Sequence, residues 1–139
     1  MIYGIGTDLV ELERIAKISG ERFLERYFSA EERDMIMHSY NAQKQTKEEY
    51  LKQNPRISKI AGNFAAKEAV AKAFGTGFSN GVAAEEIAVL RDGNGKPYIR
   101  LLGDTKKRAE EIGNLKMHVS ITNTRIYAQA FVVCELCER

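Results

Sequence analysis

The chain has 139 residues, a formal net charge of +2 at pH 7, and hydrophobic residues at 44% of its positions. This size and composition favour one domain, residues 1–139, with a hydrophobic core. The small net charge gives no indication of a nucleic-acid partner, and no apolar run is long enough to span a membrane, so neither is expected. The N-terminus lacks the basic and apolar regions of a secretory signal, which predicts a cytoplasmic protein.

A short strand over residues 2–8 is the first predicted element. Its two glycines, Gly4 and Gly6, indicate that another part of the chain approaches the strand backbone closely. Apolar residues then recur at helical spacing over residues 10–18, and a second helical segment covers residues 22–28. The chain thus begins with a strand followed by two short helices.

Ser29 and Glu32 have the spacing of a capping box, which predicts the start of another helix. Between residues 38 and 53 the chain is polar and only weakly patterned, which fits either an exposed helix or a mobile excursion. The pair Asn54-Pro55 punctuates this segment.

A long helix is predicted over residues 57–74, and it is rich in alanine between Phe64 and Phe74. Because alanine has no side chain beyond its Cβ, such a helix can pack closely against a neighbouring surface. Gly75 suits the position that ends the helix, and residues 76–81 form a glycine-rich loop.

Two further strands, residues 87–90 and 98–102, are predicted on either side of the turn sequence Asp92-Gly93-Asn94-Gly95. A polar helix over residues 104–112 follows.

The last predicted elements are the two strands of a hairpin, residues 117–122 and 126–133. The first of them alternates strictly, so that His118, Ser120 and Thr122 share one face. The order of elements along the chain predicts an α+β fold with a largely antiparallel sheet packed against the long alanine-rich helix.

Cys134 and Cys137 stand in a Cys-Glu-Leu-Cys arrangement near the C-terminus. This spacing is typical of a redox pair or of half a zinc site, but the chain has no second pair to complete such a site. No nearby feature is placed to lower a thiol pKa, so we expect two reduced thiols near a strand end.

Glu68 and Lys72 lie four residues apart on the long helix, so their side chains share one face. They fit either a surface ion pair or two groups presented to a ligand. Asp8, at the end of the first predicted strand, fits either the N-cap of the next helix or a ligand group. Asp8 and Glu68 offer the carboxylates that magnesium prefers, and Lys72 is suited to neutralise a phosphate.

His118 fits either a half-exposed residue of a sheet or a phosphate contact or acid–base group. Basic residues on the early helices fit either a solvated face or a docking surface for an acidic partner. These basic residues are Arg14, Lys17, Arg22 and Arg26, with Phe23 and Tyr27 among them.

Three blocks of the sequence carry a resemblance to a known family. They are Gly4–Glu11, Phe64–Gly77 with its Phe-Ala-Ala-Lys-Glu-Ala run and Lys72, and His118–Thr122. The turn Asn94–Pro97 fits between the last two. With these blocks the chain resembles, over essentially its full length, the holo-(acyl-carrier-protein) synthases, which are small bacterial 4′-phosphopantetheinyl transferases.

The resemblance implies transfer of 4′-phosphopantetheine from coenzyme A to a serine of apo acyl carrier protein, with adenosine 3′,5′-bisphosphate as by-product, in support of fatty acid biosynthesis. It implies three catalytic residues. Asp8 and Glu68 match the ligands of a magnesium ion, and Lys72 matches the lysine beside the leaving phosphate. The acceptor of the serine proton is either Glu68 or a metal-bound water.

The resemblance also implies a homotrimer with active sites between subunits, and it divides the remaining site residues into two groups. The coenzyme A group consists of Lys67, Gly75, Asn94, Lys96, Pro97, His118, Ser120 and Thr122. The carrier-protein group consists of Arg14, Arg22, Phe23, Arg26 and Phe64.

Three features of the chain depart from the family pattern. Asn63 stands where the family often has an arginine that contacts a coenzyme A phosphate. The candidate substitutes for that arginine are Arg56, Lys59 and Lys67. Asn123 stands where relatives often have histidine, and the polar stretch over residues 38–59 is longer than in compact relatives.

Two other functions fit the same residues. One is a non-catalytic module that binds a carrier protein or a nucleotide through its basic helices. The other is a magnesium-dependent phosphohydrolase.

Overall fold

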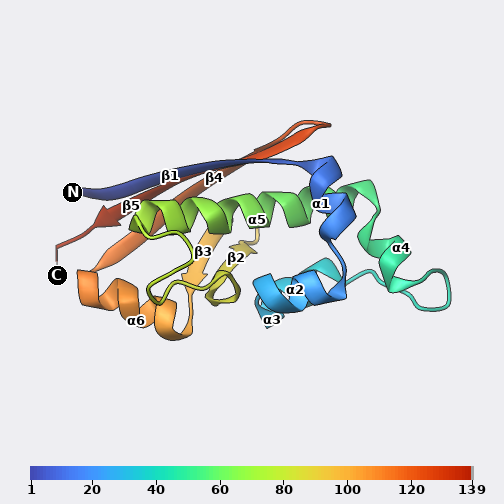
Figure 1. Cartoon of the computed structure of the whole chain (residues 1–139), viewed down its shortest axis with the longest axis horizontal. Helices are drawn as coiled ribbons and strands as arrows, with labels where there is room; N and C mark the ends of the chain where they lie inside the picture. The colour runs from blue at the N-terminus through green and yellow to red at the C-terminus, as the bar shows by residue number, and fades with distance from the viewer. Residues whose placement is uncertain (139) are drawn as a thin grey trace.

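In the computed structural model, which describes residues 1–138, one long helix lies beneath a three-stranded sheet (Figure 1). A two-stranded sheet and most of the shorter helices lie on the other side of that long helix. The elements, in chain order, are β1 (Ile2–Glu11), α1 (Leu12–Ile18), α2 (Glu21–Tyr27), α3 (Ala30–Ile36), α4 (Lys47–Leu51), α5 (Asn54–Phe74), the 3₁₀ turn η1 (Ala84–Glu86), β2 (Ile87–Arg91), β3 (Pro97–Leu101), α6 (Gly103–Ile112), β4 (Leu115–Asn123) and β5 (Tyr127–Leu136).

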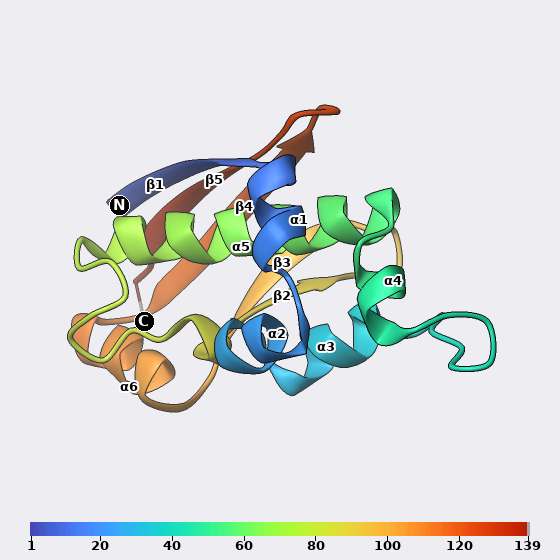
Figure 2. The same ribbon diagram turned by 45° about the vertical axis from the view of Figure 1, so that its right-hand side comes forward.

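Both sheets are antiparallel, and the predicted α+β fold is confirmed. The larger sheet has the order β1-β5-β4, so that the first strand of the chain pairs with the last, and the smaller sheet is the β2–β3 hairpin. Figure 2 shows α5 crossing under all three strands of the larger sheet, with the β2–β3 hairpin behind it. The long helix is therefore buried on more than one side.

The contact between β1 and α5 is made backbone to backbone. A Cβ atom placed on Gly6 would overlap the carbonyl oxygen of Ala69, and one placed on Gly4 would overlap that of Ala73. Only glycine on the strand and alanine on the helix allow this approach. The close approach that the two glycines predicted is confirmed.

Several element boundaries differ from the sequence prediction, and two of these differences lie in the elements that carry Asp8 and Glu68. β1 continues to Glu11 rather than ending near residue 8, because its pairing with β5 runs on to the partner Tyr127. α5 begins at Asn54, with Pro55 in its first turn, where proline is well tolerated. Its end is as predicted, since Gly75 has the left-handed φ of 84° that closes a helix.

The polar segment after α3 is partly anchored to the rest of the protein. Thr46 and Glu49 form a capping box that starts the short helix α4. Tyr50, in that helix, is buried, and its hydroxyl donates a hydrogen bond to the carbonyl oxygen of Ile36 at 2.9 Å. Of the two alternatives for this segment, a helix is therefore correct for Lys47–Leu51. Most of that helix is exposed, but Tyr50 and Leu51 are buried against the rest of the protein.

Cys134 and Cys137 are both free thiols, as predicted. Cys134 is buried in β5, and burial raises the pKa of its thiol to about 11. A thiol with so high a pKa is a poor nucleophile at neutral pH, which argues against cysteine chemistry here.

Among residues 1–138, no helix combines the length and the apolar character needed to cross a membrane.

Candidate active site

A cavity of about 470 Å³ opens between β1, the helices α1 and α2, and α5. Its lining combines two carboxylates, one arginine and a largely apolar remainder. The lining residues are Asp8, Leu9, Val10, Arg14, Ile15, Ile18, Phe23, Tyr27, Phe64 and Glu68. Asp8 and Glu68, which lie sixty positions apart in the sequence, thus face one space.

Asp8 lies in the middle of β1 on the side that faces α5. Lys72 Nζ is 3.1 Å from Asp8 Oδ1 and donates a second hydrogen bond to the carbonyl oxygen of Thr7 at 2.9 Å. Two expectations are corrected by this contact. Asp8 is not a helix cap, because β1 runs on and Glu11 precedes α1. Lys72 pairs with Asp8 across the strand–helix contact and not with Glu68 along the helix.

Glu68 is partly buried beside Asp8. Burial raises the pKa of the Glu68 carboxyl, and the negative charge of Asp8 raises it further, while Lys72 and Arg14 oppose the shift. Two carboxylates that disfavour each other's charge, at the edge of an open cavity, form a donor set that a cation would stabilise.

The donors at this position fit magnesium better than a transition metal. Within residues 1–138, no group of three or more His, Cys, Asp or Glu side chains is arranged to hold a metal ion. Magnesium does not need such a group, because it usually takes one or two carboxylates and keeps water or phosphate oxygens as its other ligands. Asp8 and Glu68 are therefore the residues that would hold magnesium.

Part of the cavity lining is aromatic. Phe23 packs on Phe64 with ring centroids 5.4 Å apart, and Tyr27 packs on both, at 5.1 Å from Phe23 and 5.9 Å from Phe64. Arg14 also lines the cavity. Three of the five residues expected to contact the carrier protein thus surround one opening.

The other two residues of that group, Arg22 and Arg26, lie on α2 outside the cavity lining, where the Arg26 guanidinium stacks 5.3 Å over the ring of Tyr27. Tyr27 is a wall residue outside the predicted carrier-protein group, although it lies among the basic residues of the early helices, four positions after Phe23 on the same helix.

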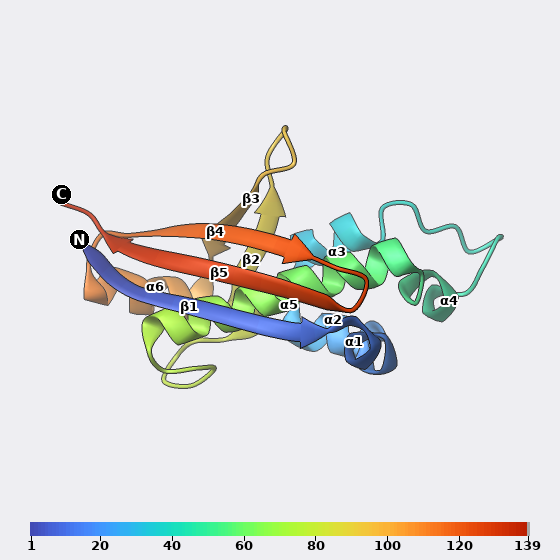
Figure 3. The same cartoon turned by 90° about the horizontal axis from the view of Figure 1, so that it is seen from above.

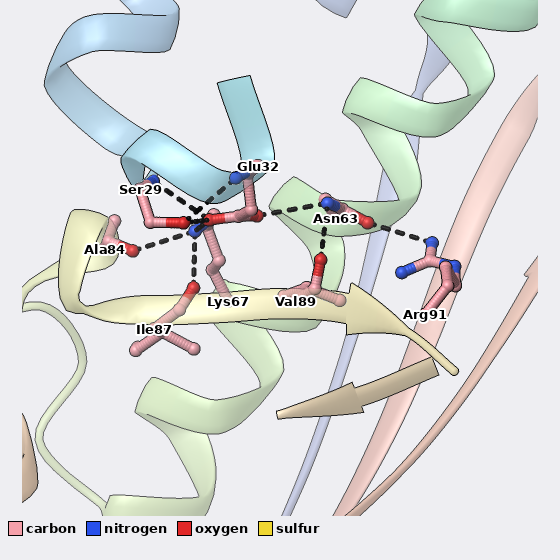
Figure 4. Close-up of polar contacts among 8 residues, drawn as sticks. All are labelled: Ser29, Glu32, Asn63, Lys67, Ala84, Ile87, Val89 and Arg91. Atoms are coloured by element: carbon pink, nitrogen blue, oxygen red, sulfur yellow. Dashed lines mark hydrogen bonds and ion pairs between the residues drawn. The ribbon is translucent and has the colours of Figure 1, made fainter. Parts of the chain in front are cut away.

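Lys67 is not available to a ligand, and its expected contact with coenzyme A is wrong. Its side chain is completely buried and its ammonium lies 2.5 Å from Glu32 Oε1. Figure 4 shows this ammonium surrounded by Glu32 and the carbonyl oxygens of Ala84 and Ile87. Burial lowers the pKa of Lys67, and the carboxylate of Glu32 opposes that shift.

Asn63 belongs to the same buried group. Its amide nitrogen donates to Glu32 Oε2 at 3.0 Å and to the carbonyl oxygen of Val89 at 3.1 Å. Its amide oxygen accepts a hydrogen bond from Arg91 at 2.9 Å. The residue at the departure from the family pattern is therefore a structural one in this chain.

The remaining coenzyme A group lies elsewhere on the protein. His118, Ser120 and Thr122 lie on the face of β4 that points away from the core, as the alternation predicted. His118 Nε2 is 2.8 Å from Glu135 Oε2, and this hydrogen bond lowers the pKa of Glu135.

The turn between β2 and β3 holds the other part of this group. The carboxylate of Asp92 accepts hydrogen bonds from the amides of Asn94 and Lys96, which confirms a turn. Figure 3 shows the β2–β3 tip projecting on the β4 side of the molecule, while β1 and α1 lie on the other side. Within one chain, the cavity with Asp8 and Glu68 does not meet the coenzyme A residues predicted on β4 and on the β2–β3 turn.

Gly75, another residue of the predicted coenzyme A group, ends α5 three positions after Lys72.

Comparison with known proteins assigns the family. Residues 4–132 match the sequence profile of the 4′-phosphopantetheinyl transferase superfamily. The chain is 39% identical over 137 residues to a holo-(acyl-carrier-protein) synthase of Lachnoclostridium phytofermentans, covering 98% of each protein. It is 42% identical over 137 residues to the enzyme of that name from Bacillus subtilis, covering 97% of each. The chain belongs to the 4′-phosphopantetheinyl transferase superfamily.

The fold agrees with solved structures of the family. The crystal structure of the holo-(acyl-carrier-protein) synthase of Neisseria meningitidis matches with a TM-score of 0.80 and 34% identity, covering 97% of this chain and 99% of that one. The enzyme from Bacillus anthracis, crystallised in complex with coenzyme A (3′,5′-ADP), matches with a TM-score of 0.77 and 32% identity over 99% of both chains. The family resemblance and the enzyme class predicted from the sequence are confirmed.

Proposed function

We propose that this protein transfers the 4′-phosphopantetheine group of coenzyme A to a serine of apo acyl carrier protein. The observation that carries the proposal is that Asp8 and Glu68 line one cavity together with Arg14 and aromatic side chains, while Lys72 pairs with Asp8. These are the three residues that the family resemblance assigns to the reaction. The enzymes named as its relatives carry the same activity in their names.

Magnesium is the proposed cofactor, held by Asp8 and Glu68. When bound, it would supply charge neutralisation for the pyrophosphate oxygens of coenzyme A. The raised pKa of Glu68 supports this assignment, since a carboxylate pair with unfavourable mutual charge binds a cation more readily than two isolated ones.

Lys72 is the proposed partner of the leaving phosphate. Its ammonium is half exposed and fixed by Asp8 and the carbonyl oxygen of Thr7, so that it is oriented before a substrate arrives. An oriented positive charge stabilises the negative charge that develops on a leaving phosphate. Among the side chains of the cavity, Glu68 is the proposed acceptor of the serine proton, because the other carboxylate, Asp8, is paired with Lys72.

A trimer is the proposed assembly, with the outer face of the larger sheet at its centre. Ile5 and Leu9 of β1 are 60% and 57% exposed, and Phe131 of β5 is 46% exposed, so large apolar side chains cover the middle of this face. Exposed apolar surface of this kind marks an association site. His118 is on the same face, which supports coenzyme A binding between one subunit's cavity and a neighbour's β4.

The coenzyme A contacts proposed for that neighbouring surface come from two elements, β4 and the β2–β3 turn. They are Asn94, Lys96, Pro97, His118, Ser120 and Thr122. Gly75 keeps its proposed contact from the side of α5, whereas Lys67 is removed from the group by its burial. Asn63 stands where the family often has an arginine that contacts a coenzyme A phosphate. Arg56 and Lys59 remain the proposed substitutes for that contact.

Carrier-protein docking is proposed at the mouth of the cavity, where Arg14, Phe23 and Phe64 lie together. Arg22 and Arg26 extend the positive charge along α2 toward an acidic partner. A cytoplasmic location and a part in fatty acid biosynthesis belong to the same proposal.

One experiment separates this function from its two rivals. The protein is incubated with coenzyme A, magnesium and folded apo acyl carrier protein, and the intact mass of the carrier is measured. We expect a mass increase of one phosphopantetheine group that disappears when the metal is chelated. A carrier that binds but is never modified indicates a non-catalytic module. Phosphate release from nucleotides without any carrier indicates a phosphohydrolase.

A further inference from the structure

Glu32 and Lys67 form a completely buried ion pair that the proposed reaction does not use. They come from α3 and α5, and both side chains have no exposed area. All their hydrogen-bonding groups are occupied. Besides Lys67, the Glu32 carboxylate accepts from the amide and hydroxyl of Ser29 and from Asn63, each at 3.0 Å. The Lys67 ammonium also donates to the carbonyl oxygens of Ala84 and Ile87.

Stability alone does not account for this pair. Two ions removed from water lose their hydration, and apolar residues of similar volume at such a place are often as stabilising or more so. A fully hydrogen-bonded polar network fixes the relative position of the elements that it joins, because its hydrogen bonds are satisfied together in only one arrangement. Figure 4 shows that this arrangement joins the start of α3, the middle of α5 and the strand β2.

The pair is connected to the cavity wall through aromatic rings. The Lys67 ammonium lies 4.9 Å from the ring centroid of Phe28, the residue between α2 and α3. Phe28 packs on Phe23 at 5.8 Å, and Phe23 packs on Phe64 at 5.4 Å. Phe23 and Phe64 line the same cavity as Asp8 and Glu68.

The pair is also connected to the carboxylates of the cavity, through Glu68. Lys67 is followed directly by Glu68, and a helix turns by about 100° per residue. The two side chains therefore leave α5 in different directions, one into the buried network and the other into the cavity. A rotation or slide of α5 that moved Glu68 would break the contacts of Lys67.

We propose that Glu32 and Lys67 are positioning residues: they hold the α2–α3 unit on α5 so that Phe23 and Tyr27, the α2 part of the aromatic wall, stand at a fixed distance from Asp8 and Glu68. The ligand that depends on this spacing is the carrier protein, whose serine must reach the carboxylate side while its surface rests on the aromatic side. This inference rests on the proposed function. It assigns the pair to carrier-protein use and not to coenzyme A binding.

The deciding variant carries Glu32→Gln together with Lys67→Met, which removes both charges and leaves an oxygen for the amide of Ser29. Its unfolding by urea, its kcat and its KM for each substrate are compared with those of the wild type. We expect it to fold and to raise the carrier-protein KM about tenfold, because small misplacements of a binding wall are costly, while the coenzyme A KM stays within about twofold. A folded double variant with an unchanged carrier-protein KM, or with both KM values raised equally, overturns the proposal.

A second variant keeps the test decisive if the double variant does not fold. Phe28→Leu leaves the ion pair intact and removes the ring that links it to Phe23. We expect a rise of about threefold in the carrier-protein KM alone, and no rise overturns the proposal. Val70→Ala is the matched control. Val70 is a buried residue of α5, and the hydrophobic cluster in which it packs does not include Phe28. It should change neither KM.

Carrier-protein binding without coenzyme A, measured by calorimetry, separates this inference from the proposed function. If the wild type binds the carrier but never modifies it, the proposed reaction fails. The positioning role then still predicts weaker carrier binding in the double variant, and equal binding refutes it.

Discussion

Helix α5 carries two lysine–carboxylate pairs in opposite surroundings. Lys67 and Glu32 have no exposed area and lie 2.5 Å apart. Lys72 and Asp8 lie 3.1 Å apart, with the lysine 53% and the aspartate 15% exposed. Both pairs join α5 to another element, α3 in one case and β1 in the other. Each pair joins a lysine to a carboxylate, so the surroundings of the two pairs must account for most of any difference in role.

Burial closes the first pair to ligands and exposure leaves the second open to them. A buried ammonium with three protein acceptors has no reason to leave them, and it cannot reach a substrate. The half-exposed Lys72 ammonium has two protein acceptors, so its third donor is available to a phosphate. The comparison therefore assigns structure to the buried pair and chemistry to the open one.

The largest expected effect is on stability at the buried pair. Lys67→Met leaves the Glu32 carboxylate buried without its counter-ion, and we expect a loss of about 3–5 kcal/mol in the free energy of unfolding. Lys72→Met is the matched control, because it breaks a partly exposed pair and should cost about 1 kcal/mol or less. Urea denaturation of both variants measures the difference. Equal losses would mean that burial does not distinguish the two pairs.

The open pair depends on the close contact of β1 with α5, and this contact is tested by Gly6→Ala. The new methyl group would overlap the carbonyl oxygen of Ala69, so the strand must move away from the helix. We expect a loss of about 1–3 kcal/mol in unfolding free energy and a lower kcat, because Asp8 moves with the strand.

Gly20→Ala is the control for this substitution, since a Cβ atom there would meet nothing within 4 Å. As an N-cap position of α2, Gly20 should tolerate alanine at a cost of about 1 kcal/mol or less. The close-contact explanation is wrong if both glycines tolerate alanine equally well.

Arg14 lines the cavity in which Asp8 of the open pair lies. Reversal of its charge by Arg14→Glu should raise the KM for an acidic carrier protein about tenfold and leave the KM for coenzyme A nearly unchanged. Steady-state kinetics with each substrate varied in turn measures both values. Equal increases would place Arg14 in the coenzyme A site.

The smallest expected effect on stability concerns Glu68, where removal of a charged group should stabilise the folded protein. The pKa of Glu68 is raised in the folded protein, so its ionisation at neutral pH opposes folding. Glu68→Gln should therefore unfold at a higher temperature than the wild type at pH 7, while turnover is lost. The gain should vanish below the ordinary pKa of 4.5, where the wild-type carboxyl is protonated in both states. A variant that is less stable at pH 7 and unchanged at acidic pH would contradict the shift.

Much of the fold and the core of the site could be predicted from local sequence. The alternation of β4 gave the exposed face of His118, and the two glycines of β1 gave the close approach to α5. Asp8 and Glu68 were singled out for their chemistry, and the structure brings both to one cavity. The helix α4 also has a local signal, since Thr46 and Glu49 have capping-box spacing.

The roles of the two lysines could not be separated in this way. α5 is buried on more than one side and is alanine-rich all round, so it has no single apolar stripe to indicate which direction faces the interior. Lys67 and Lys72 then look alike in sequence. The pairing of Lys67 with Glu32, and that of β1 with β5, depend on segments distant in the chain.

The most direct test of the contrast between the pairs is the rate at which Lys72→Met modifies apo acyl carrier protein, measured by mass spectrometry with magnesium and both substrates at saturation. We predict a kcat about 100- to 1,000-fold below that of the wild type, as expected for loss of one oriented charge at a developing anion, with nearly unchanged unfolding free energy. A folded Lys72→Met protein that modifies the carrier at close to the wild-type rate would contradict the assignment of chemistry to the open pair.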